Sequence, residues 1–200
     1  MIEIEIDMDT DGIFPNFLEG DVNTVAPRLL GCELERTINS QTIRVRIVEV
    51  ESYDQEDMAS HAYGGPSKRN AVMFGPAGHL YVYFTYGMHY CCNVVTGMEG
   101  YGSGVLIRAV EPLDENPLLI ANRHGITGHN LTNGPAKLCQ ALAIDGQLGG
   151  HNLHGRPLRL IARPTLAPSD IVITTRIGIS KAVDSPRRFY IKDNPFVSRP

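Results

Sequence analysis

The sequence His79-Leu-Tyr-Val-Tyr-Phe-Thr-Tyr-Gly-Met-His-Tyr-Cys-Cys-Asn-Val-Val95 predicts a β-hairpin, and this hairpin decides the fold. Two runs of aromatic and β-branched side chains flank a short turn that contains the only glycine of the stretch. If the turn has three residues, Thr85 lies opposite His89. One face of the hairpin then carries Tyr81, Tyr83, Cys91 and Asn93. A turn of two residues would instead place Tyr83 and Asn93 on opposite faces.

The segments around the hairpin predict further strands and two helices. Alternating apolar and polar side chains indicate a half-buried strand from Ile43 to Ser52. Runs of similar character predict strands over residues 105–110, 158–162, 171–177 and 189–192. One helix is expected between Thr24 as N-cap and Gly31 as the C′ glycine, and another from Asn133-Gly134-Pro135 to Ile144. Because helices and strands do not alternate regularly, we predict a single α+β domain with a mostly antiparallel β-sheet, a protruding β-hairpin and a few peripheral helices.

The chain is long enough for one domain, and its acidic residues are concentrated at its start. Its 200 residues can bury a single sizeable core. We separate an acidic N-terminal arm, residues 1–20, from a folded domain, residues 21–200. The formal net charge of −4 argues mildly against a nucleic-acid partner, but the basic residues beyond the arm could still form a basic face. Without a membrane-length apolar run or a signal peptide, we expect a cytoplasmic monomer, associated with the nucleoid if the source is bacterial.

The cysteines and histidines do not form a recognisable metal-binding motif. The four cysteines have no CxxC spacing, and Cys91 and Cys92 are adjacent, which ligands of one structural zinc rarely are. The seven histidines include no HExxH motif. We therefore expect reduced, buried cysteines, no metal site and no cofactor.

The strand over residues 43–52 ends in two carboxylates that need an explanation. Continuing its alternation places Glu49 and Glu51 on the face that begins with Ile43, while Val48 and Val50 point the other way. Either a bulge switches the register, or a carboxylate is aimed into a cleft at the end of the strand. The alternative is that both are ordinary charges on a solvated surface.

Aromatic residues near these carboxylates could form a pocket for a flat, cationic base. Stacking contributes roughly 1 to 3 kcal/mol per base, and a positive ring adds a cation–π interaction. Tyr53, His61 and Tyr83 could supply the aromatic faces, although each taken alone is more typical of the margin of a core. Tyr86, in the hairpin turn, could be a wedge that fills the space of an extruded base, or an exposed aromatic residue without a role.

The motifs that carry this chemistry follow one another in a characteristic order. They are Ile47-Val-Glu-Val-Glu-Ser-Tyr53, His61, Arg69-Asn70, Met73-Phe74, Tyr81-Val-Tyr-Phe-Thr-Tyr-Gly-Met88, Cys91-Cys-Asn93, Leu106-Ile-Arg-Ala-Val-Glu-Pro112, Gly134-Pro-Ala-Lys-Leu-Cys-Gln-Ala-Leu-Ala143, Arg188-Phe-Tyr190 and Asn194-Pro-Phe-Val197. In order and spacing, over about residues 24 to 198, the sequence resembles the alkyladenine (3-methyladenine) DNA glycosylase family.

The resemblance implies a monofunctional DNA glycosylase whose catalytic domain spans residues 21–200. Such an enzyme would flip alkylated or deaminated purines, such as 3-methyladenine, out of damaged double-stranded DNA. It would hydrolyse the N-glycosidic bond without lyase activity, metal or cofactor, and so start base excision repair. By this resemblance Glu51 would deprotonate the attacking water and Arg108 would orient it.

The resemblance also assigns residues to the base and to the DNA. The base-binding residues would be Tyr53, His61, Tyr83 and Asn93, with Asn93 against the guanine amino group. The DNA-binding residues would be Tyr86, Met88, His89 and Lys137, with Tyr86 in the gap of the duplex and the others on flanking phosphates. We expect Glu49 to matter far less than Glu51.

Two other functions fit parts of the sequence. A hydrolase of free nucleosides would need no wedge and would tolerate the loss of Tyr86. A non-catalytic module that binds RNA or DNA would tolerate the loss of Glu51.

Overall fold

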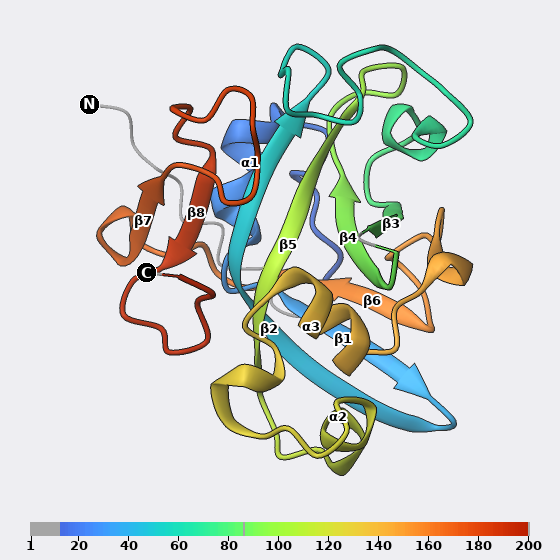
Figure 1. The fold of residues 1–200 in the computed structure, drawn as a ribbon, viewed down its shortest axis with the longest axis vertical. Coiled ribbons are helices and arrows are strands. Elements are labelled where there is room, and N and C mark those ends of the chain that lie inside the picture. The colour runs from blue at the N-terminus through green and yellow to red at the C-terminus, as the bar shows by residue number, and fades with distance from the viewer. Residues whose placement is uncertain (1–12, 86, 200) are drawn as a thin grey trace.

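The fold is built around β2 (Gln41–Asp54), a long strand that pairs with three others (Figure 1). In the computed structural model, which describes residues 13–85 and 87–199, β5 (Ser103–Pro112) lies along one edge of β2. The other edge is divided between β1 (Glu33–Ile38) and β8 (Arg188–Ile191). All of these pairings are antiparallel, as predicted.

Four further strands extend the sheet on both sides of this centre. They are β3 (Leu80–Thr85), β4 (His89–Val95), β6 (Leu158–Ile161) and β7 (Ile171–Thr174). The order β3-β4-β5-β2-β1-β6 puts the hairpin at one end of the sheet, and β7 pairs with β8 beside this path. The result is the α+β fold with a mostly antiparallel sheet that the sequence predicted.

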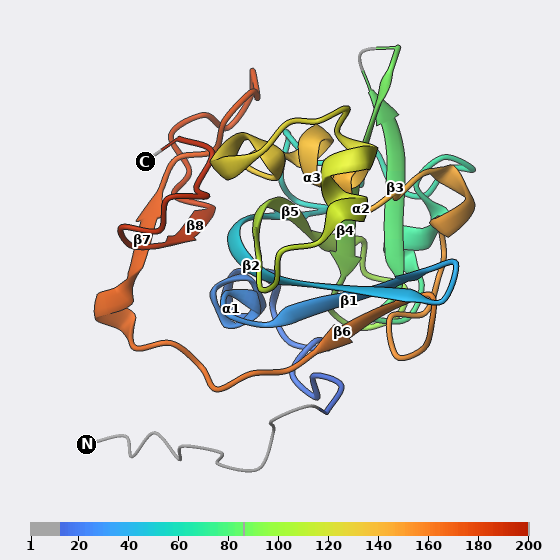
Figure 2. The same ribbon diagram turned by 90° about the horizontal axis from the view of Figure 1, so that it is seen from below.

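Short helices cover the sheet from both sides. The described residues form the α-helices α1 (Val22–Leu29), α2 (Pro117–Asn122) and α3 (Pro135–Ala141), and the 3-10 helices η1 (Ala71–Phe74), η2 (Gly128–Leu131), η3 (Gly146–Leu148) and η4 (Pro168–Asp170). Figure 2 shows α1 and α3 on opposite faces of the sheet. None of the helices in this part of the chain is long and apolar enough to cross a membrane.

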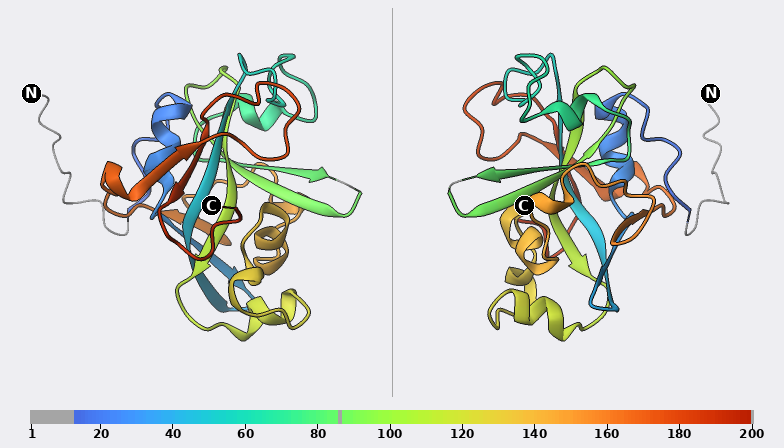
Figure 3. Two further views of the ribbon diagram at one scale, coloured as in Figure 1. Left: turned by 60° about the vertical axis from the view of Figure 1, so that its left-hand side comes forward. Right: turned by 90° about the vertical axis from the view of Figure 1, so that its right-hand side faces the viewer.

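The hairpin has the register expected for a three-residue turn. Thr85 lies opposite His89, and Tyr83 lies opposite Cys91. One face therefore carries the predicted set of Tyr81, Tyr83, Cys91 and Asn93. The two strands project well beyond the body of the domain (Figure 3).

Two irregularities in the β2–β5 pairing decide where the carboxylates of β2 lie. The register shifts between Ile47 and Glu49 and shifts back between Glu49 and Val50, which leaves Val48 and Arg108 without a partner. Val50 then continues the apolar side of the strand into the main core. The bulge that we offered as one explanation is thus present, and the uninterrupted alternation is wrong.

Some boundaries differ from the predictions for identifiable reasons. The N-cap of α1 is Asp21, whose carboxylate accepts a hydrogen bond from the Asn23 amide at 2.9 Å, whereas the predicted cap Thr24 lies inside the helix. The helix over α3 stops three residues before the predicted Ile144, and Ala143 has a φ of 47°, which a helix does not allow. The sequence patterns did not predict β1 and α2.

The predicted N-terminal arm falls partly outside the described residues. Residues 1–12 of that arm are not among them. From residue 13 the chain lies against the domain, where Leu18 is 2% exposed and belongs to the main core. The ring of Phe14 packs edge-on against His154 at 5.0 Å.

Gly102, just before β5, provides a test of the packing beneath the hairpin. A Cβ atom on Gly102 would lie 2.5 Å from Phe74 and 2.8 Å from Ala62, in a small cluster that also contains Met73 and Tyr81. We expect Gly102→Ala to lower the free energy of unfolding by about 1 to 3 kcal/mol through overpacking. Urea denaturation would measure the loss.

Gly64→Ala is the matched control. No atom lies within 4 Å of a Cβ built on Gly64, and its φ is not positive. Its free energy of unfolding should stay within about 0.5 kcal/mol of the wild-type value. Equal stability of the two variants would show that the cluster can rearrange at no cost.

Candidate active site

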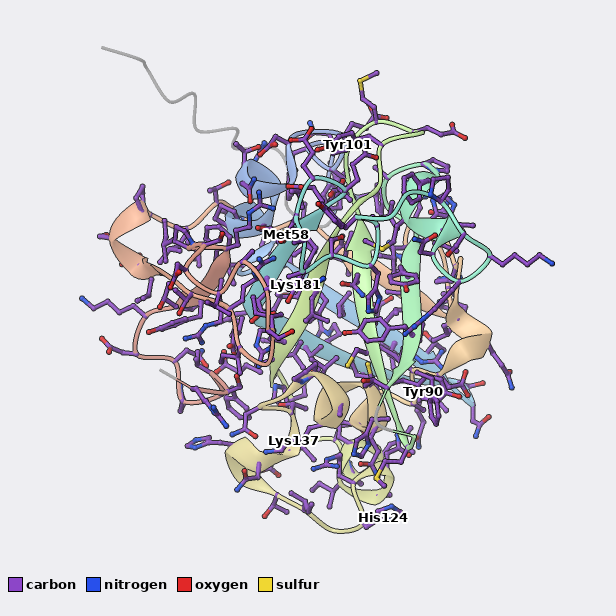
Figure 4. All side chains as sticks on the ribbon, turned by 45° about the horizontal axis from the view of Figure 1, so that its top comes forward. Met58, Tyr90, Tyr101, His124, Lys137 and Lys181 are labelled. Carbon is purple, nitrogen blue, oxygen red and sulfur yellow. The ribbon has the colours of Figure 1, made fainter. Side chains whose placement is uncertain are left out.

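A cavity of about 650 Å³ opens where the base of the hairpin meets the sheet. Its walls come from β2 to β5, from the loop over residues 55–79 and from the loop over residues 175–187. Figure 4 shows Met58 and Lys181, one from each loop, together at this cavity. The lining includes all of the predicted catalytic and base-binding residues, namely Glu51, Tyr53, His61, Tyr83, Asn93 and Arg108. The volume is that of a typical small-ligand pocket.

Glu51 lies in the wall of this cavity, and its carboxylate has three hydrogen-bond donors from the protein. Its side chain has no exposed surface, and Glu51 is one of the residues that line the cavity. Oε1 accepts a hydrogen bond from the Ile177 amide at 2.8 Å and lies 3.2 Å from Nη1 of Arg108. Oε2 accepts a hydrogen bond from the Tyr53 hydroxyl at 2.7 Å. Burial and the neighbouring carboxylate raise the pKa of Tyr53, so this phenol stays protonated and can donate.

Glu49 is buried in an adjacent ion-pair network. Its Oε1 atom lies 3.1 Å from Nε of Arg108 and 2.9 Å from Nη1 of Arg188. Ser198 donates its amide to Oε2 at 2.7 Å and its hydroxyl to Oε1 at 2.9 Å. Burial lowers the pKa of Arg108, but the charges of Glu51 and Glu49 outweigh this effect and raise it. The interpretation of Glu49 and Glu51 as solvated surface charges is therefore wrong.

Three aromatic rings stand together on the opposite wall. His61 meets Tyr83 edge-on, with ring centroids 4.6 Å apart, and its Nδ1 atom lies 3.0 Å from the Tyr81 hydroxyl. The rings of Tyr81 and Tyr83 stack at 5.7 Å. Burial, with a contribution from Arg69, lowers the pKa of His61 and so favours the neutral imidazole. The cluster offers flat, uncharged faces to a ligand.

Tyr53 is supported from behind by a buried ion pair. The guanidinium of Arg176 lies over the Tyr53 ring, 4.6 Å from its centroid. It pairs with Asp57 and donates to the Ser52 carbonyl at 3.1 Å. Because Ile177 follows Arg176 directly, the same ion pair also places the amide that binds Glu51.

Asn93 and Cys91 complete the wall beside the aromatic rings. The Asn93 side chain is 4% exposed and donates to the Tyr81 carbonyl at 3.3 Å, which leaves its amide oxygen as an acceptor. Burial raises the pKa of Cys91 to about 11, so its thiol is neutral. The four cysteines are free and buried, as expected. No group of three or more His, Cys, Asp or Glu side chains that could hold a metal ion occurs within residues 13–85 and 87–199.

Three of the predicted DNA-binding residues, Met88, His89 and Lys137, lie outside the cavity lining. Met88 is 70% exposed near the hairpin turn, and His89 is half-buried at the start of β4. Lys137, on α3, donates to the side-chain oxygens of Asn133 at 2.7 Å and Asn130 at 3.2 Å. Tyr86 is not among the described residues.

The sequence patterns missed the residues that the loop over 175–187 contributes. Arg176 and Ile177 were predicted to end a strand, but β7 stops at Thr174 and both belong to this loop. Lys181 is an exposed cation in the cavity lining, and it forms no hydrogen bond or ion pair with the described residues. Its position after Gly178 and Ser180, in a polar stretch, was the available signal of a loop.

Comparisons with known proteins agree with this geometry. A family model described as methylpurine-DNA glycosylase (MPG) matches residues 16–195. A protein of Carboxydothermus hydrogenoformans is 52% identical over 184 residues, which cover 92% of this chain and 96% of the relative. A protein of Methanoculleus marisnigri is 50% identical over 186 residues, with the same coverage. Both relatives are named, by inference, as 3-methyladenine DNA glycosylases.

The Asp57–Arg176 pair should contribute strongly to stability. The two side chains are 2% and 0% exposed, and removal of Arg176 would leave the buried Asp57 carboxylate with only the more distant, partly exposed Arg187 at 3.6 Å as a cationic partner. We expect Arg176→Met to lower the free energy of unfolding by about 3 to 5 kcal/mol in urea denaturation. Burial raises the pKa of Asp57, but Arg176, the Ala59 amide and Arg187 together lower it, so the stabilisation is present above the ordinary Asp pKa. It should be lost as pH falls through the lower folded-state pKa.

Two further variants separate this effect from general damage. Arg159→Met removes one partner of the partly exposed Glu35–Arg159 pair and should cost less than about 1 kcal/mol. Arg176→Met combined with Asp57→Asn should be less destabilising than Arg176→Met alone, because no charge is then left unpaired. A double variant as unstable as the sum of its parts would contradict the ion-pair explanation.

Proposed function

Because the chain belongs to the methylpurine-DNA glycosylase family, we propose that it flips alkylated purines from duplex DNA into the cavity and hydrolyses their N-glycosidic bond with water activated by Glu51. Its membership makes it a DNA-repair enzyme that hydrolyses N-glycosidic bonds, as predicted from the sequence. We further propose that it acts as a monomer on damaged double strands and accepts deaminated purines. The observation that carries the mechanism is the buried carboxylate of Glu51 in the wall of an aromatic cavity.

The hydrogen bonds of Glu51 suit a general base. An ionised carboxylate has about four acceptor positions. Tyr53, Arg108 and Ile177 each direct a donor to Glu51, which leaves about one position for a water molecule. These donors fix the orientation of the carboxylate before the substrate arrives. Glu51 would take a proton from this water as the oxygen attacks C1′ of the sugar.

The rest of the cavity suits the base that leaves. An alkylated purine carries a positive charge, which the faces of Tyr53 and Tyr83 and the neutral His61 can accept. Cleavage of the glycosidic bond returns the bonding electrons to the base and neutralises it, so departure needs no strong acid. The free oxygen of Asn93 could select among purines by what it accepts from the base edge.

DNA would approach along the projecting hairpin. Tyr86 would occupy the space left by the flipped base, and Met88, His89 and Lys137 would lie near the flanking phosphates. Lys181 supplies a further exposed cation at the cavity. Because the net charge of −4 opposes contacts with phosphates, we expect a modest salt dependence.

Replacement of Glu51 by Gln tests the proposed base directly. The amide keeps the shape of the side chain but cannot take a proton from water. We expect the single-turnover excision rate to fall by about 10²- to 10⁴-fold, while affinity for lesion DNA changes little. Excision under saturating enzyme and equilibrium binding to the same duplex would be measured for each variant.

Glu111→Gln is the control, because Glu111 lies on β5 and forms an exposed pair with Arg46. It should excise at nearly the wild-type rate. If Glu51→Gln excises as fast as this control, Glu51 is not the base and the mechanism is wrong. If the wild-type protein cleaves free nucleosides but excises no base from any methylated duplex, the alternative of a nucleoside hydrolase is supported instead.

Replacement of Tyr86 by Ala tests base flipping. If the wedge offsets an unstacking cost of roughly a few kcal/mol, its loss should slow excision of a paired lesion more than excision of the same lesion in a single strand. Single-turnover rates on the two substrates would give the ratio. Equal losses on both would remove Tyr86 from this role.

A further inference from the structure

Glu49 is a buried carboxylate that the proposed reaction leaves without a task. Its side chain has no exposed surface and accepts hydrogen bonds from Arg108, Arg188 and Ser198. Buried ion pairs often stabilise a protein no more than a packed apolar core would. A cluster of this kind, one β-strand repeat from the proposed base, therefore suggests a functional role.

We propose that Glu49 is a positioning residue, which holds Arg108 and offsets its positive charge so that Glu51 remains basic enough to deprotonate water. This inference rests on the proposed function, because it concerns how Glu51 works as a base.

Arg108 connects the two carboxylates through different nitrogen atoms. Its Nε atom lies 3.1 Å from Oε1 of Glu49, and its Nη1 atom lies 3.2 Å from Oε1 of Glu51. The guanidinium is planar and rigid, so its hydrogen bond to Glu49 limits the direction from which it can reach Glu51. Arg108 has no opposite residue in the β2–β5 register, and the two carboxylates therefore determine its setting.

The charges of this cluster balance when Glu49 is included. Glu49 and Glu51 contribute two negative charges, and Arg108 and Arg188 contribute two positive charges. Removal of Glu49 leaves one negative charge against two positive ones, with Arg108 only 8% exposed and hence poorly screened by water. Excess positive charge favours the ionised form of Glu51 and makes it a weaker base.

The other titratable groups at the cavity do not replace this balance. Lys181 is exposed, so water screens its charge, and the lowered pKa of His61 favours its neutral form. Tyr53 on β2 and Cys91 on β4 are neutral, because burial raises the pKa of both groups. Arg176, from the loop over 175–187, is paired with Asp57. Glu49 is therefore the anionic group placed to offset the charge of Arg108.

The test is the pH dependence of single-turnover excision of 7-methylguanine from a duplex. The charge of this base does not change over the acid limb of the rate profile, because 7-methylguanine in DNA is already a cation there. The acid limb therefore reflects the titration of a group on the enzyme. Glu49→Gln should move the midpoint of the acid limb to lower pH by roughly 1 unit, because a nearby negative charge is lost. Glu51→Gln is expected to lower the plateau rate by about 100-fold or more. Glu49→Gln should lower it by less than this.

Arg188→Gln provides the opposite change in the same cluster. It removes a positive charge bonded to Glu49, so the midpoint should move to higher pH. The charge-balanced double variant, Glu49→Gln with Arg188→Gln, should return toward the wild-type midpoint. Glu111→Gln removes an exposed charge of the same sign and should leave the midpoint unchanged. Thermal melts would fix an assay temperature at which each variant is folded.

Opposite shifts in the two single variants would support the inference, because loss of packing alone cannot reverse sign with charge. Shifts in the same direction, or no shift in folded variants, would overturn it. If Glu49→Gln does not fold, the other two variants decide. The midpoint of Arg188→Gln should then rise and that of the double variant should lie near the wild-type value, and any other result would overturn the inference. Wild-type excision by Glu51→Gln would instead overturn the proposed function, and the two failures are thus distinguishable.

Discussion

The site depends on the cost of keeping a carboxylate charged away from bulk water. A buried charge is tolerated only when partners satisfy it, and Glu51 receives three such partners. They come from β2, from β5 and from the loop over 175–187, which are distant in sequence. Sheet pairing, bulge and loop must all be formed before the carboxylate can be held in this state. The site therefore forms only in the fully folded domain, because its contacts come from several distant segments.

The paired irregularities in the sheet show how a regular strand is adapted to this requirement. A perfect alternation along β2 would send Glu49 and Glu51 toward the main core, among apolar side chains such as Val50 and Ile107. The extra residue at Val48 reverses the parity of the strand, and the extra residue at Arg108 restores the pairing beyond it. The apolar side chain of Val50 then enters the core, while Glu51 and Arg108 both line the cavity. One local defect on each strand thus separates the apolar and the charged halves of the sheet.

The distribution of basic residues also explains how an acidic protein can act on DNA. Arg108, Arg176 and Arg188 are buried and bonded to internal carboxylates, so they contribute little to the outer surface. Recognition would then rely on aromatic stacking inside the cavity and on a few exposed cations, such as Lys181, at its mouth. Such an interface reads the chemistry of the base more than the charge of the backbone.

The sequence by itself determined the features that depend on near neighbours. The hairpin and the class of fold were predicted from local patterns, and the structure chose the three-residue turn from the two turn lengths that the sequence left open. The motifs of the resemblance also named the six predicted residues that the fold brings to one cavity. Tertiary structure alone decided the rest. The Ile177 amide lies 126 positions from Glu51 in the sequence, and Ser198 lies 149 positions from Glu49. No periodicity within a strand can reveal such contacts. They form only when β8 packs against β2 and the segments before and after β8 bury both carboxylates.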